Sequence, residues 1–286
     1  MEGGVMDLGL SQILTFERDP GDRNRTSPFA FTGNRFEFRA VGSSQSVSGP
    51  LVAMNTMLAD SLNWIAEKLE AELSKGTDQA AAVLAVLKEL MELHGNVVFG
   101  GDGYSTDWHK AAVEERGLKN IPTTADALPA LREESVKKLF ESTGVLSPVE
   151  LESRFEVYSE QYILSIEVEA KLVIEMAKSM IYPAAIQYLG KISDTSASME
   201  GMGIELDNSV AKIVAAEVNA MMAAVSKLVE AMEKEDFAST EEHMQFCADE
   251  IRGLMDRIRA HADTLEGEIS DELWPLPKYR EMLYIK

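Results

Sequence analysis

The sequence is organised around the stretch DRNRTSPFAFTGNRFEFR, residues 22–39. Near its end, Arg35, Glu37 and Arg39 alternate with two phenylalanines. Because side chains alternate between the two faces of a strand, this period of two predicts a β-strand with one charged and one apolar face. The three charged groups would then project from one side of a rigid element.

A carboxylate between two guanidinium groups stays ionised, and the group as a whole is suited to binding an anion. Arginines hold a phosphate or a substrate carboxylate through paired hydrogen bonds. Arg23 and Arg25 precede a Ser-Pro turn and add positive charge from a loop. The structural alternative is a salt-bridged surface strand, and the residues by themselves favour neither interpretation.

The same stretch resembles a known family. RNRTSP (23–28) and GNRFEFR (33–39) are similar to the C-terminal part of the glutamine synthetase catalytic domain, and SPFAFTGN (27–34) with GSS (42–44) resembles its type III branch. GDGYS (101–105), DALP (126–129) and LWPLPKYREML (273–283) resemble the helical C-terminal extension of that branch. The resemblance covers roughly residues 21–286, with the motifs in the expected order.

The resemblance implies roles for individual residues. Glu37 corresponds to a ligand of the catalytic Mg²⁺ or Mn²⁺ ion, and Arg39 to an arginine that holds the substrate glutamate. Arg25 corresponds to an arginine that faces the transferred phosphate of ATP, and Arg35 to one on the nucleotide side. Arg23 is a further candidate for binding ATP.

The implied function is ATP-dependent ligation of ammonium to glutamate through a γ-glutamyl phosphate, in a homo-oligomer. Family enzymes carry a long region upstream that supplies most metal-binding carboxylates, and this chain resembles their final third or so. We therefore expect the 286 residues alone to be inactive. The alternative is a non-catalytic helical oligomerisation or interaction module derived from such an enzyme.

Composition excludes several other functions. The formal net charge of −21 disfavours binding to nucleic acid and to anionic membranes. Cys247 is the only cysteine, so no intrachain disulfide can form, and no apolar stretch approaches the ~20 residues of a membrane span. These features predict a cytoplasmic protein that binds neither nucleic acid nor membrane.

The expected fold is mainly α, with residues 1–75 as the end of the catalytic domain and residues 76–286 as a helical extension. Apolar periodicity predicts helices over 50–75, 80–94, 108–116, 123–141, 208–234 and 239–265, and a long helix from 147 that Pro183 kinks or ends. Residues 97–99 suggest a short extended piece, and 193–203 a loop. Capping boxes are predicted at Ser147 and Ser239, and the Trp-Pro-Leu-Pro tail is expected to pack back on the bundle.

Other candidate chemistry has ordinary structural explanations. The GGDG run at 100–103 lacks the Gly-Lys-Ser/Thr ending of a phosphate-binding loop and is interpreted as a turn. The four histidines have no zinc-site spacing, and His261 is expected to be a hydrogen-bonded core residue. The acidic side chains of residues 150, 152, 156 and 160 are interpreted as a solvated face.

Overall fold

The computed structural model describes residues 46–97, 103 and 105–283, without the side chains of residues 279 and 280, together with the backbone of four short strands. The strands form two antiparallel hairpins, β1 (Val5–Met6) with β2 (Phe16–Glu17) and β3 (Phe29–Phe31) with β4 (Phe36–Phe38). In the second hairpin Ala30 pairs with Glu37. The strand expected from the Arg-Phe alternation is thus confirmed for residues 36–38.

The chain divides into two compact units, residues 1–120 with 139–145 and residues 121–138 with 146–286. In the first unit, α1 (Ser48–Ser74) packs against α2 (Gln79–His94), and Lys68 Nζ lies 2.6 Å from Glu89 Oε1 across the pair. The turn between them follows the expected chemistry. Gly76 has a φ of +81°, and the Asp78 side chain caps α2 by accepting from the amide of Ala80.

The first unit continues through a short 3₁₀ turn, η1 (Gly95–Val97), and helix α3 (Thr106–Glu114). The Ser105 hydroxyl caps α3, and Gly117 follows it with a φ of +67°. The extended piece expected at 97–99 is wrong at Val97, which lies in the 3₁₀ turn, and residues 98 and 99 lie outside the described residues.

The single helix predicted over 123–141 is wrong, because this segment forms three pieces. They are α4 (Thr124–Ala127), the 3₁₀ turn η2 (Leu128–Arg132) and α5 (Glu134–Ser142). Pro129 has no amide hydrogen, and its ring disfavours regular helix in the preceding turn. Glu133 then adopts extended backbone, with a ψ of 137°, so the direction of the chain changes just after Arg132.

The longest rod of the second unit consists of α6 (Pro148–Met176), a π-helical turn η3 (Ala177–Ile181) and α7 (Tyr182–Glu200). The capping box at Ser147 is confirmed. Pro183 does not end the rod. The adjacent π turn widens the helix, and the amide of Tyr182 donates to the carbonyl of Ala177.

The loop predicted over 193–203 is wrong for most of its length, because α7 continues to Glu200. The hydroxyls of Thr195 and Ser198 donate to the carbonyls of Lys191 and Asp194, one turn earlier. Such bonds satisfy small polar side chains inside a helix, so their composition does not identify a loop.

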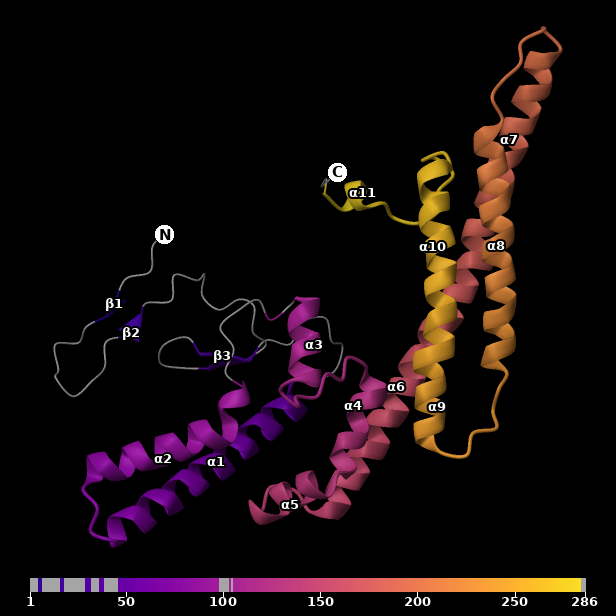
Figure 1. Cartoon of the computed structure of the whole chain (residues 1–286). Coiled ribbons are helices and arrows are strands. Elements are labelled where there is room, and N and C mark those ends of the chain that lie inside the picture. Colours follow the sequence, from indigo (N-terminus) through magenta and orange to yellow (C-terminus); the bar gives the residue numbers. More distant parts are fainter. Residues whose placement is uncertain are drawn as a thin grey trace. The chain divides into compact units, whose positions relative to one another are not determined.

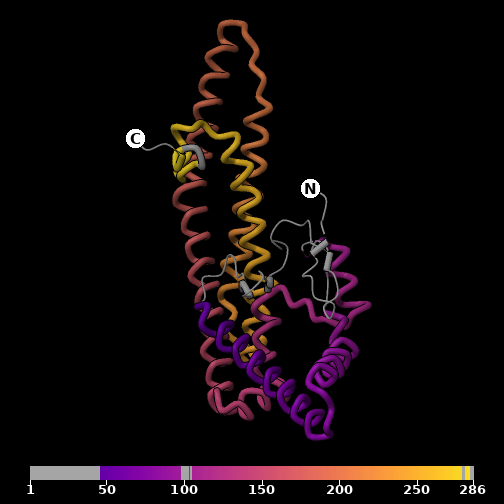
Figure 2. Tube along the Cα trace, turned by 90° about the vertical axis from the view of Figure 1, so that its left-hand side faces the viewer, coloured from indigo at the N-terminus to yellow at the C-terminus, as the bar shows by residue number. Residues whose placement is uncertain are grey.

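The chain then returns as α8 (Ser209–Met232) and, after a second turn, as α9 (Thr240–Phe246), the π turn η4 (Cys247–Ile251) and α10 (Arg252–Glu268). In Figures 1 and 2, α8 and α10 lie side by side, and the α6–α7 rod packs along both of them. The predicted seam of α9 and α10 is confirmed, since its side chains are buried in the bundle core except at His261. The largest fully buried side chains of this core include Leu151, Phe155, Met221, Leu228, Met244, Ile251, Leu254 and Leu265.

Two local predictions near the ends of this unit have different outcomes. The Trp-Pro-Leu-Pro tail does pack back on the bundle, since Trp274 is buried in its core, before the short helix α11 (Tyr279–Leu283). The capping box at Ser239 is only half formed. Its hydroxyl accepts from the amide of Glu242, but the Glu242 carboxylate accepts from the amide of Ala238 instead of Ser239.

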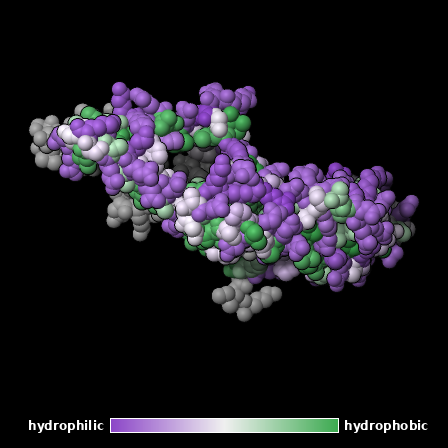
Figure 3. Space-filling view, turned by 90° about the horizontal axis from the view of Figure 1, so that it is seen from below, coloured by the Kyte–Doolittle hydropathy of each residue, from purple (hydrophilic) through white to green (hydrophobic). Residues whose placement is uncertain are grey.

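Within the described residues, α8 alone is long and apolar enough to cross a membrane by length and composition. Its buried side chains include Val214, Val218, Met221 and Leu228, which belong to the bundle core. On the face shown in Figure 3, apolar side chains lie in separate patches among polar ones. Packing in the bundle core therefore accounts for the buried apolar side chains of α8.

The core packing predicts that substitutions at two valines of the second unit differ clearly in their effect on the free energy of unfolding. Val225 is fully buried and Val149 is 79% exposed. We expect Val225→Ala to lower the free energy of unfolding by about 2 kcal/mol, because it removes two buried methyl groups and leaves a cavity. Val149→Ala should change it by less than about 0.5 kcal/mol. Urea unfolding followed by circular dichroism measures both, and equal effects would contradict the assignment of the core.

Candidate functional site

The site predicted from the sequence lies mostly outside the described residues. This applies to Arg23, Arg25, Arg35 and Arg39, and to the side chain of Glu37. The structure gives only the backbone of Glu37, in the middle of β4 and opposite Ala30 in β3. The roles of these five residues in binding metal, glutamate or ATP therefore stay predictions.

The described residues do not form a metal site. Among them, no group of three or more His, Cys, Asp or Glu side chains is arranged to hold a metal ion. Mg²⁺ and Mn²⁺ prefer several oxygen ligands in regular geometry, which a single carboxylate does not supply. The ion implied by the family resemblance thus requires ligands beyond the part of the chain that the structure describes.

The most highly connected polar group of the second unit is Arg132, which sequence reasoning missed. The Arg132 side chain projects from η2 and contacts Glu152 and Glu156 of α6 and Glu241 of α9. Its Nε lies 2.9 Å from Glu152 Oε1, its Nη2 lies 2.7 Å from Glu156 Oε1, and its Nη1 lies 2.9 Å from Glu241 Oε1. We call these four residues the Arg132 cluster.

The ring of Phe155 completes the surroundings of this guanidinium, at 3.7 Å from its central carbon. A planar cation fits the face of an aromatic ring well, and Phe155 is itself fully buried. Thr240 Oγ1 also donates to Glu156 Oε2 at 3.2 Å. The cluster therefore connects three separate elements over a core residue.

The pKa shifts within the Arg132 cluster agree with a role in holding these elements together. Hydrogen bonding from Arg132 holds the pKa of Glu152 below its ordinary value, and the carboxylates raise the pKa of the Arg132 guanidinium. The side chains of Glu152 and Glu156 are 45% and 41% exposed, so these carboxylates are solvated as predicted, but the prediction missed their ion pairs with Arg132. Glu160 is exposed as well. No sequence signal identified the cluster, because its cation is 20 residues from its nearest carboxylate along the chain.

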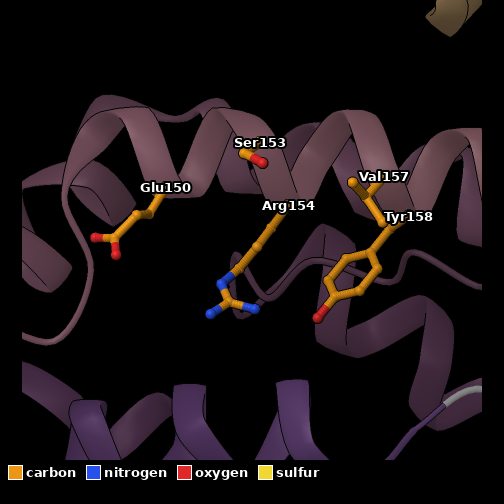
Figure 4. Close-up of a pocket in the computed structure, with 5 residues that line it drawn as sticks. All are labelled: Glu150, Ser153, Arg154, Val157 and Tyr158. Carbon is orange, nitrogen blue, oxygen red and sulfur yellow. The ribbon is translucent and has the colours of Figure 1, made fainter.

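A shallow hollow lies along the outer face of α6 and is lined by Glu150, Ser153, Arg154, Val157 and Tyr158. Figure 4 shows that Glu150, Arg154 and Tyr158 extend from the same side of this helix. Glu150 is already bonded to Ser147 in the capping box, and Arg154 has only a longer-range electrostatic interaction with it. The hollow thus presents one cation and one phenol beside an apolar side chain.

Two histidines form polar pairs within the bundle. His261 Nδ1 lies 2.6 Å from Glu217 Oε2, which confirms that it is hydrogen-bonded, although its side chain is half-buried and does not belong to the core. His243 lies 3.6 Å from Glu167 and stacks on Phe237, with ring centroids 4.1 Å apart. Among the described residues, neither pair belongs to a group of three side chains that could hold a metal ion, so both are interpreted as links between helices.

With this geometry in place, comparison with known proteins identifies the class of domain. Residues 82–200 match the family described as the glutamine synthetase C-terminal domain. This range includes most of α2, all of α3, the Arg132 cluster apart from Glu241, and the α6–α7 rod. This part of the chain is similar to that family.

Similarity to whole proteins extends further along the chain. The chain is 38% identical over 290 residues to a type-3 glutamine synthetase of Dictyostelium discoideum, covering 98% of this chain and 39% of that protein. It is 33% identical over 294 residues to a glutamine synthetase of Bacteroides fragilis, covering all of this chain and 40% of that protein. It is 31% identical over 278 residues to a glutamine synthetase of Butyrivibrio fibrisolvens, covering 96% of this chain and 39% of that protein.

The resemblance inferred from the sequence is therefore confirmed, and the chain is a relative of glutamine synthetases. It spans about 40% of the length of these relatives. The predicted boundary between residues 75 and 76 stays a prediction. The family match begins at residue 82, and the compact units divide at a different place, between residues 120 and 121.

The Arg132 cluster generates a prediction about stability. Arg132→Met keeps an unbranched apolar stem but removes the charged guanidinium group, so three carboxylates lose their shared partner. Because these carboxylates are solvent-exposed, we expect the free energy of unfolding to fall by no more than about 1 kcal/mol near neutral pH. Arg259→Met is the matched control, because Arg259 forms an exposed pair with Asp263 within α10. It should have almost no effect.

The difference between these variants should depend on pH. Because Arg132 lowers the pKa of Glu152 in the folded state, its contribution is present above the ordinary glutamate value of about 4.5 and is lost as the pH falls below it. Urea unfolding at several pH values between roughly 3 and 7 measures this. An effect of Arg132→Met that is equally large at the acidic end would contradict the ion-pair explanation.

Proposed function

We propose that this chain supplies the C-terminal part of a glutamate–ammonia ligase, which makes glutamine from glutamate, ammonium and ATP through a γ-glutamyl phosphate. The observation that carries this proposal is 38% identity to a type-3 glutamine synthetase over 98% of the chain. That similarity includes the arginine-rich stretch from residue 22 to residue 39. Its residues have the chemistry that an ATP-dependent ligase of carboxylates requires.

In this proposal, each arginine acts through charge and geometry. Arg39 holds the substrate glutamate by paired hydrogen bonds to a carboxylate, for which the planar guanidinium is suited. Arg25 faces the phosphoryl group that moves from ATP to the substrate, where a fixed positive charge stabilises the negative charge of the transition state. Arg35 and Arg23 contribute to binding the nucleotide phosphates.

Glu37 is proposed as one ligand of the Mg²⁺ or Mn²⁺ ion that the family uses. Such an ion would neutralise charge on the transferred phosphoryl group when it is bound. One carboxylate does not complete its coordination, and the described residues contribute no further set of ligands. We therefore assign no step to the ion from this chain, and we propose that other parts of the enzyme supply the remaining ligands.

The second candidate function is a helical interaction module without catalysis, and the fold of the second unit favours it. That unit has a continuous apolar core of its own and is held together by structural polar groups such as the Arg132 cluster. Both proposals place the protein in the cytoplasm and give it partners of its own kind. They differ in whether the arginine-rich stretch takes part in turnover.

An activity measurement separates the two candidates. The 286-residue chain, purified alone, is expected to form no glutamine from glutamate, ammonium and ATP above a reaction without protein. The region of the Dictyostelium type-3 enzyme that matches this chain should then be replaced by it. If the chain carries functional site residues, this chimera should form glutamine in an ATP-dependent reaction. A folded but inactive chimera would support the interaction module.

The chimera also tests the role of Arg39. Arg39→Lys keeps the charge but removes the paired geometry, so we expect the KM for glutamate to rise by roughly 10–100-fold with a smaller change in the KM for ATP. Arg18→Lys, at an arginine to which we assign no role, is the matched control. Unchanged glutamate dependence, or a loss confined to ATP, would contradict the assignment of Arg39 to the substrate.

A further inference from the structure

Helix α6 is apolar on two opposite faces. One face is buried in the bundle core through residues such as Phe155, Ile166 and Ala170. On the other side, Val157, Leu164, Val168 and Leu172 are 55%, 61%, 55% and 50% exposed. At 100° per residue, these four side chains lie within a narrow sector opposite the core. We call them the outer stripe.

Four charged residues accompany the outer stripe on the same side of the helix. Arg154 lies one turn before it, in the hollow of Figure 4, and Glu175 lies one turn after it. Glu160 and Lys171 flank its middle and its end. Among the described residues, Arg154 and Glu175 have no ion-pair partner, and Lys171 has only a loose contact of 3.9 Å with Glu167. Their charges are thus available to a partner.

The positions of these charges favour one kind of occupant. In an antiparallel pair of α6 helices centred between residues 164 and 165, Val157 of one copy lies level with Leu172 of the other. Leu164 then lies beside its own copy at the centre, and Val168 lies level with Gln161, about one turn from the centre. The same arrangement brings Arg154 level with Glu175, and Lys171 within one turn of Glu160, on both sides of the two-fold axis. Opposite charges meet wherever the apolar side chains overlap.

A parallel pair gives the opposite result. Each residue would then lie beside its own copy, so that Arg154 would face Arg154, and Glu160 would face Glu160. Such contacts between like charges are unfavourable, especially in a chain with a net charge of −21. A two-fold interface, in which the same patch serves both partners, is also the commonest way for a protein to bind itself.

We propose that the outer stripe of α6 is a self-association surface, on which a second copy of this chain docks its own α6 in antiparallel orientation. The inference goes beyond the proposed function, because it does not depend on catalysis by either copy. Leu164 and Val168 supply the apolar centre, and the Arg154–Glu175 pairs fix direction and register.

Cysteine cross-linking tests the orientation directly. Val157→Cys and Leu172→Cys in the same chain place two thiols level with each other across the antiparallel pair, so a short bifunctional maleimide should yield a covalent dimer. Each single variant should not, because identical positions are then about 15 residues, or roughly 22 Å, apart along the axis. The unmodified chain gives the background, since its only cysteine, Cys247, is buried.

A charge swap tests the register. Arg154→Glu and Glu175→Arg should each weaken self-association at least tenfold, measured by sedimentation velocity over a range of concentrations. The two substitutions combined restore opposite charges across the interface and should restore association. Leu164→Glu should abolish it, whereas Val149→Glu, on the same helix but outside the outer stripe, should leave it unchanged.

These measurements also identify the results that overturn the proposal. Cross-linking of Leu172→Cys alone would indicate a parallel pair, and no cross-linking of the double cysteine variant would exclude α6 as the contact. Failure of the combined charge swap to restore association would contradict the register. A chain that stays at its monomer mass of 31.5 kDa at all concentrations would contradict self-association altogether.

Discussion

The structure of the second unit depends on the burial of one side of helix α8 against α10, α7 and α6. Val214, Val218, Met221, Val225 and Leu228 recur on its buried side and are almost completely removed from water. Each such side chain contributes on the order of 1.5–3 kcal/mol when it is buried. Caps, π turns and ion pairs affect where the helices end and how they are oriented. They supplement the apolar packing, which holds the helices together.

Much of this architecture was predictable, because it rests on local signals. The spacing of apolar residues gave the helices, and the start of α6 followed from Ser147, Pro148 and Glu150, which satisfy exposed amides within one turn. The ends of helices were less predictable where two effects competed. Pro183 is compatible with a continuous rod only because a π turn precedes it, and nothing in the local sequence indicates that turn.

The Arg132 cluster could not be predicted for a different reason. Its members come from η2, α6 and α9, and Arg132 is 109 residues from Glu241 along the chain. The break at Pro129 and Glu133 had to be known before Arg132 could be placed beside α6. The arginine-rich stretch shows the converse, since its motif is recognisable in sequence while the strand pairing of β3 and β4 is all that the structure adds there.

Net charge connects the two parts of this interpretation. ATP and glutamate are anions, and a chain with a net charge of −21 repels them over most of its surface. The site that we propose for them therefore requires a local excess of positive charge, and residues 23–39 contain four arginines. The same repulsion acts between copies of the chain. A surface for self-association must then combine exposed apolar side chains with arginines and lysines placed opposite carboxylates, and the outer stripe of α6 has this combination.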